Sequence, residues 1–191
     1  MRLTRDRILD EALDLILTDG LRRASATELA RRLAVVKSGL YHHFPGGKSE
    51  IFDAVFEREE TALIDAMTRA SSGASVQQKL ASVCRAKISR ITEVTRRLPL
   101  REEAANDIEG YLLSRGRFQR LEKELIGRLL EEGMSSGEVR AIPGDLVVAA
   151  FQGALARVSK AFALNAGKRR LTVVDELVEV LFRGIGGDGK P

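Results

Sequence analysis

Residues 25–50 read SATELARRLAVVKSGLYHHFPGGKSE, and this stretch decides the fold. Ser25 is well placed to cap a helix, because its hydroxyl can accept a hydrogen bond from a first-turn backbone N–H. Glu28 follows at the spacing of a capping box, and Leu29, Ala30 and Leu33 then supply an apolar face. The pattern predicts a short helix of about two turns.

A second short helix follows a break at Ala34-Val35-Val36. Leu40 and Phe44 lie one helical turn apart, which indicates a helix over about Val36–Phe44 with these two side chains buried. Pro45-Gly46-Gly47 ends it. Two short helices joined by a tight turn are typical of a helix-turn-helix, whose second helix enters the major groove of DNA.

The rest of the chain is also helical in its periodicity. Thr4 and Gly20 bound a first amphipathic helix. Further helices are expected from Lys48 past Met67, from Ser75 to Leu98, over about Arg115–Met134, over Asp145–Ala166 with Asp145 as cap, and over Thr172–Gly184. We therefore predict an all-α fold. Its parts are a three-helix DNA-binding domain at 1–50, a helical ligand-binding and dimerisation domain at 51–185, and a tail at 186–191.

Charge and composition narrow the class of protein. The net charge is only +4, but the segment Gly20–Lys48 holds six cations against one carboxylate, Glu28. Such an excess is either a solvated face or a surface for a polyanion. With one cysteine, Cys84, the chain has no intrachain disulfide, and we see neither a signal peptide nor a membrane span. We expect a cytoplasmic protein, with the basic tract Lys168-Arg169-Arg170 joining the last two helices.

The motif residues carry a family resemblance. Thr27-Glu28-Leu29-Ala30, followed by the string KSGLYHHFPGGKSE from Lys37 to Glu50, resembles the signature of the TetR family of transcriptional regulators. The resemblance is strongest over residues 5–56, and the string FPGGK particularly resembles the LmrA/YxaF-like branch. It implies a homodimeric repressor that binds palindromic double-stranded operator DNA and is released by a small-molecule effector.

The same resemblance implies DNA contacts at matching positions. The candidates are Thr27, Lys37, Ser38, Gly39, Tyr41, His42, His43 and Lys48. Lys48 begins a helix, where backbone N–H groups and the helix dipole attract a phosphate. His42 has better odds of facing DNA than His43, which directly precedes the buried Phe44.

Two positions depart from the family pattern. Family members usually have Gly in the turn and Ser, Thr or Pro before the recognition helix, where this chain has Ala34 and Val36. A positive φ at Ala34 costs about 1 kcal/mol relative to Gly, and Val36 cannot cap a helix. Gly39 also leaves less side chain for reading bases.

The C-terminal half is expected to pair two chains and to enclose a ligand. Because the Asp145–Ala166 helix is apolar on more than one face, it needs covering on every side, which favours a dimer over a core helix of a monomer. The interface candidates are Phe151, Ala154, Leu155, Val158, Phe162, Val174, Leu177, Val178 and Leu181. The pocket candidates are Met67, Cys84, Asn106, Tyr111, Phe118, Phe151 and Gln152, although each residue type is more often plain core or surface.

Three alternatives stay open. An enzyme is disfavoured because zinc-ligand spacing, a phosphate-cradling glycine loop and a G-x-S-x-G elbow are missing from the sequence, so no catalytic residue, metal or cofactor is expected. A helical scaffold that binds DNA without sequence preference would show steep salt dependence and no operator. Activation rather than repression is the third alternative.

Overall fold

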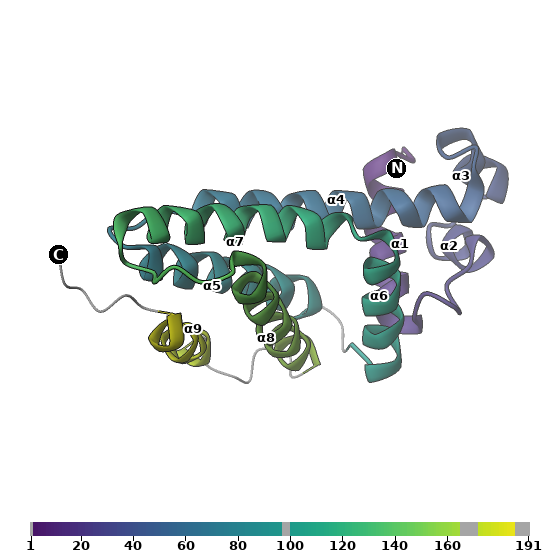
Figure 1. Cartoon of the computed structure of the whole chain (residues 1–191). Coiled ribbons are helices and arrows are strands. Elements are labelled where there is room, and N and C mark those ends of the chain that lie inside the picture. The colour runs from purple at the N-terminus through teal and green to yellow at the C-terminus, as the bar shows by residue number, and fades with distance from the viewer. Residues whose placement is uncertain (1, 97–99, 165–171, 186–191) are drawn as a thin grey trace.

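The computed structural model describes residues 2–96, 100–164 and 172–185, which fold into α-helices joined by short turns (Figure 1). The helices are α1 (Arg5–Asp19), α2 (Ala26–Arg32), α3 (Lys37–His43), α4 (Gly47–Ala70), α5 (Val76–Arg96), α6 (Glu102–Arg115), α7 (Arg117–Ser136), α8 (Gly144–Leu164) and α9 (Thr172–Ile185). The all-α prediction is confirmed. The predicted helix ends at Leu98 and Ala166, the basic tract Lys168-Arg169-Arg170 and the tail 186–191 lie outside the described residues.

The N-terminal helices begin where their caps predict. The Thr4 hydroxyl accepts a hydrogen bond from the Arg7 N–H at 3.3 Å, and the Ser25 hydroxyl accepts one from the Glu28 N–H at 3.1 Å. Leu40 and Phe44 are fully buried in the core that α1, α2 and α3 share. Short helices of this length need such tertiary packing, because isolated ones are marginal in water.

Helix α4 joins the two halves of the molecule (Figure 1). Its first turns place Ile51, Phe52, Val55 and Phe56 in the N-terminal core, and Met67 near its other end lies in the second core. The N-terminal core therefore extends past residue 50, and the domain boundary there remains a prediction.

Helix α6 is an element that the sequence periodicity did not predict. It stands beside α1 (Figure 1) and buries only the small residues Ala104 and Ala105, so its apolar pattern is weak. Gly116, at φ 63°, separates α6 from α7. For that reason α7 begins at Arg117 rather than at Arg115. The helix ends at Ser136, two residues beyond the predicted end at Met134.

Helix α8 differs from the prediction at its start. It begins at Gly144, and Asp145 lies in its first turn with its carboxylate 2.7 Å from the Lys123 ammonium instead of acting as the cap. The ion pair holds the pKa of Asp145 below its ordinary value. By length and composition α8 could also cross a membrane, although the sequence pattern had predicted no membrane span. Its buried face packs into the second core, as in the core helix of a soluble protein.

Candidate DNA-binding surface and ligand cavity

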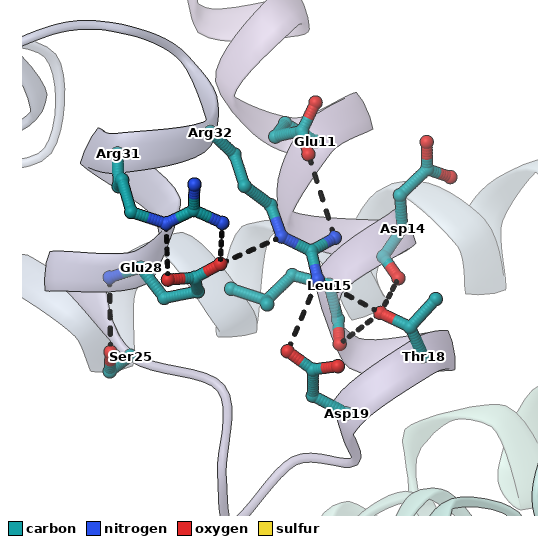
Figure 2. A network of polar contacts seen from close by, with 9 residues as sticks. All are labelled: Glu11, Asp14, Leu15, Thr18, Asp19, Ser25, Glu28, Arg31 and Arg32. Carbon is teal, nitrogen blue, oxygen red and sulfur yellow. Dashed lines mark hydrogen bonds and ion pairs between the residues drawn. The ribbon is translucent and has the colours of Figure 1, made fainter.

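A network centred on Arg32 fixes α2 against α1 (Figure 2). Its guanidinium donates to the Glu28 carboxylate at 3.3 Å, the Thr18 hydroxyl at 3.3 Å and the Asp19 carboxylate at 3.2 Å, and lies 3.7 Å from the Glu11 carboxylate. One cation thus ties the end of α2 to three positions of α1. The orientation of the helix that precedes α3 follows from these contacts.

Glu28 completes the network from the other side. Its carboxylate accepts hydrogen bonds from Arg31 at 2.6 and 2.8 Å, and from Arg32 (Figure 2). These bonds, above all those from Arg31, hold the pKa of Glu28 at about 2, well below its ordinary value. The carboxylate predicted for a capping box therefore neutralises two arginines of the basic segment.

The turn between α2 and α3 shows the two departures that the sequence indicated. Ala34 has φ 54°, a left-handed conformation that favours glycine. Val36 occupies the N-cap of α3 with no polar side-chain atom to offer, and 71% of it is exposed. Val36 directly precedes α3, so its exposed side chain lies at the start of that helix.

Helix α3 presents most of the predicted DNA-contact residues to solvent. Lys37, Ser38, Tyr41 and His42 are exposed, as is Thr27 on α2. His43 is half-buried, and its backbone carbonyl accepts a hydrogen bond from Arg5, whose guanidinium stacks 4.0 Å from the Phe44 ring centre. The outward position of His42 agrees with the expectation that it is the better placed of the two histidines.

Gly39 faces inward, towards the N-terminal segment. A Cβ atom at this position would lie 3.6 Å from Leu3 Cδ2 and 4.0 Å from Val35 Cβ, within ordinary van der Waals contact. Gly39 therefore contributes a close approach of α3 to the residues before α1. A base contact from this residue would come from its backbone.

Lys48 lies exposed in the first turn of α4, with its ammonium 5.2 Å from the Phe52 ring centre. The neighbouring Gly46 N–H already donates to the Glu50 carboxylate at 2.6 Å. A phosphate at this helix start would therefore meet the Lys48 ammonium and share the remaining N–H groups with Glu50.

A cavity of about 450 Å³ lies in the C-terminal half and reaches the N-terminal one. Its wall comes from α1, α4, α5, α6, α7 and α8, and is mostly aliphatic. Leu13, Ile16 and Leu17 of α1 and Phe56 and Leu63 of α4 belong to it. Its volume is in the range of small-molecule sites.

Of the seven predicted pocket residues, Phe118 and Gln152 line this cavity. Met67, Cys84 and Phe151 are instead buried in the second core, where burial raises the pKa of the Cys84 thiol to about 12. Tyr111 packs on Phe56 and donates to Asp53, and Asn106 lines a smaller polar hollow beside α1. Four of these five side chains lie outside the main cavity because they are used by the packing between helices, whereas Asn106 is exposed and accepts a hydrogen bond from Lys160.

The charged groups of the cavity wall were not among the residues predicted from the sequence. Glu60, Lys87 and Glu122 are buried, and each lies in the wall. A signal was available, because Glu60 continues the apolar stripe Phe56, Leu63 and Met67 of α4 at helical spacing. A charge on an apolar stripe indicates a buried partner or a ligand.

The predicted dimer-interface residues differ in how deeply they are buried within the chain. Phe151, Leu155, Phe162, Val174 and Val178 are buried within the chain's own core, and Val158 and Leu181 pack partly against it. The first five are therefore corrected to intrachain core residues, whereas Ala154 and Leu177 stay half-exposed. Leu146 on α8 and Val180 on α9 are each 68% exposed, and Ala150 on α8 is exposed as well.

Comparison with known proteins finds a family match for the N-terminal segment. Residues 8–55 match the family described as "Bacterial regulatory proteins, tetR family". Over 60 residues the chain is 35% identical to the uncharacterized HTH-type transcriptional regulator TtgW of Pseudomonas putida. That match covers 31% of this chain and 44% of the relative, so less than half of TtgW is spanned.

Solved structures resemble the whole chain. A regulatory protein of the tetR family from Rhodococcus RHA1 has a TM-score of 0.78 at 17% identity, covering 98% of this chain and 99% of that one. FadR from Bacillus subtilis, solved in complex with stearoyl-CoA, has a TM-score of 0.72 at 21% identity, covering 95% and 100%. At these identities the likeness shows the fold.

The fold and site define an all-α protein with an N-terminal helix-turn-helix domain on a larger helical domain. Its N-terminal segment, residues 8–55, matches the TetR family of bacterial regulatory proteins, and its fold is the one that solved structures of that family show. Its assignment to the LmrA/YxaF-like branch stays a prediction.

Proposed function

We propose that this protein is a cytoplasmic transcriptional repressor that binds palindromic operator DNA as a homodimer. The exposed side chains of α3, held on the α1–α2 frame by Arg32, are the observation that carries the proposal. Lys37, Ser38, Tyr41 and His42 offer hydrogen-bond donors to bases and phosphates. Lys48 adds a cation beside them.

Two copies are expected because one short recognition helix makes too few base contacts for a tight operator complex. The outer faces of α8 and α9 support pairing, since Leu146 and Ala150 on α8 and Val180 on α9 are exposed apolar residues. Small residues on α8 permit close approach of a partner helix. The interface proposed here replaces the buried residues that the sequence favoured.

A small-molecule effector in the cavity is proposed to release the DNA. The cavity supports this, because its wall includes side chains of α1 and α4, the helices that carry α2 and α3. FadR, of the same fold, was solved with a long-chain ligand, stearoyl-CoA. A ligand that moves α4 or α1 changes the separation of two recognition helices, and a coupling of about 1–3 kcal/mol suffices for regulation.

Selection of bound sequences from a random DNA library at near-physiological salt tests the DNA proposal, with the molar mass measured by light scattering. We expect an enriched palindrome whose half-sites lie about one helical turn apart. Binding with no enriched sequence would favour the nonspecific scaffold. If the ligand-free dimer binds no DNA, the proposal that this protein is a transcriptional regulator is refuted.

Two lysine variants test whether α3 makes the contacts to the selected DNA site. Lys37→Ala is expected to weaken the selected site by about 5- to 150-fold, as for loss of a base or phosphate contact. Lys123→Ala on α7 removes an exposed lysine of the other half and should leave affinity unchanged. Equal effects of both substitutions would show that net charge, and not α3, governs binding.

A further inference from the structure

The cations in the cavity wall are already engaged by carboxylates. Lys87 lies 2.6 Å from Glu122, Arg90 lies 2.8 Å from Glu59, and Lys160 lies 2.8 Å from Glu109. All six side chains line the cavity. A ligand anion would therefore have to compete with a protein carboxylate for each cation.

The fourth carboxylate of the wall is only half satisfied. Glu60 is 3% exposed, and its Oε2 accepts a hydrogen bond from Arg117 at 3.2 Å. Its Oε1 is buried and has no hydrogen-bond partner among the described residues. A buried carboxylate oxygen without a donor is costly, so this atom calls for a donor from a ligand or from water.

The other open polar atoms of the wall can accept as well. Gln119 and Ser159 belong to the same wall, and the Gln119 amide oxygen and the Ser159 hydroxyl are buried and lack a partner within the described part of the chain. An ionised carboxylate and an amide oxygen accept hydrogen bonds and donate none. The oxygen atoms of this wall that lack a hydrogen-bond partner therefore favour a ligand that donates a hydrogen bond.

We propose that the cavity binds an apolar molecule with a single protonated amine, which donates to Oε1 of Glu60. This inference deepens the effector role proposed above and rests on it. The amine replaces the missing donor with a charge-assisted bond, which is about twice as strong as a neutral one. The aliphatic wall contributed by α1, α4 and α6 takes the apolar body.

Four probes that share a decyl chain test the head group: decylamine, decanol, decyl methyl ether and decanoate, each below its micelle-forming concentration. Calorimetric titration of the full-length protein at pH 7 gives the affinities, because an alkylamine is protonated there. We expect decylamine to bind at least about tenfold tighter than the ether, which accepts but cannot donate, and tighter still than decanoate.

A matched pair of variants identifies the acceptor. Glu60→Gln keeps an oxygen for Arg117 but removes the charge, and we expect it to abolish most of the preference for decylamine over decanol. Glu124→Gln makes the same charge change on the exposed side of α7 and should leave the preference unchanged. Thermal melting and operator binding without ligand show that each variant is folded.

The outcomes separate the two proposals. Tightest binding by decanoate, or by stearoyl-CoA added as a further probe, would overturn the amine inference while leaving the effector site in place. Unchanged amine preference in Glu60→Gln would overturn the role of Glu60. If decylamine binds through Glu60 but operator affinity stays the same, the effector function fails and the assigned head group stands. Failure of all probes to bind would overturn the inference.

Discussion

The two halves of the molecule use ion pairs in different settings. Arg32 of α2 is 23% exposed in its side chain and meets several acceptors on α1 and α2. Lys87 of α5 is only 6% exposed in its side chain and depends on the Glu122 carboxylate, itself buried. Water can replace a lost partner in the first network, whereas the second pair has little access to water.

The difference bears on what each half can bind. Around α3 the cations Lys37 and Lys48 face solvent and remain available to DNA phosphates. In the cavity the cations are engaged by carboxylates, and a carboxylate oxygen is left open. The same chain thus presents a surface suited to DNA around α3 and a cavity suited to a ligand that donates a hydrogen bond.

Removing Lys87 gives the largest expected loss of stability. Lys87→Met leaves the Glu122 carboxylate buried without its cation, which costs about 3–5 kcal/mol. The measurement is the free energy of unfolding from urea titration. A loss below about 1 kcal/mol would contradict the desolvated character of the pair.

The double variant Lys87→Met with Glu122→Met serves as the control. Replacing both buried charges by apolar side chains of similar size is often neutral or stabilising, so we expect it to regain most of the lost stability. If the double variant is as unstable as Lys87→Met, then the loss comes from packing of the lysine stem on Phe118 instead of from charge.

Arg32→Ala should cost less, about 1–2 kcal/mol, because the acceptors left behind can be solvated. Operator affinity is expected to fall as well, since α2 loses its tie to Thr18 and Asp19. Arg31 is the matched control, because its side chain is 72% exposed and contacts only Glu28 among the residues that the structure describes. Arg31→Ala should lower the stability less than Arg32→Ala does, because an exposed ion pair such as that with Glu28 contributes little, and equal losses would refute the bridging role of Arg32.

Ala34→Gly should stabilise the protein by up to about 1 kcal/mol. A left-handed conformation costs an L-residue roughly 1–2 kcal/mol, and part of this gain is offset because glycine makes the unfolded chain more flexible by about 0.4–1 kcal/mol. For a chain of this size the melting temperature would rise by about 2–4 °C per kcal/mol. A lower melting temperature would show that the Ala34 methyl group makes contacts that outweigh its strain.

The sequence was sufficient for the N-terminal half because its signals are local. Residues a few positions apart predict the caps at Thr4 and Ser25 and the buried pair Leu40 and Phe44. The positive φ at Ala34 was suggested instead by the glycine that family members usually have in this turn. The greater exposure of His42 than of His43 also agrees with the position of the buried Phe44, whereas the DNA contact of His42 stays a prediction.

The C-terminal half resisted prediction because its features depend on which helices meet. Cys84 and Phe151 carry the right chemistry for a pocket but face the core, and α6 has too weak an apolar pattern to be recognised. A hydrophobic residue on α8 could face either its own core or a second chain, and periodicity alone does not separate the two. Glu60 on an apolar stripe was the local signal that pointed to the cavity.

Acid unfolding tests the smallest of the expected effects, which is the contribution of the ionised Glu28 carboxylate to the stability of the folded state. Its folded pKa of about 2 lies below the ordinary value of 4.5, so the ionised form favours the folded state. The contribution is fully present above pH 4.5 and is lost as the pH falls from there towards 2. We therefore expect the stability difference between wild type and Glu28→Gln to be constant from about pH 7 to 5 and to shrink below pH 4.5, as measured by urea unfolding of both proteins at each pH. A difference that stays constant or grows in acid would mean that Arg31 does not hold Glu28 in its ionised form. The Glu28 carboxylate would then neutralise less of the positive charge of Arg31 and Arg32 than the geometry indicates.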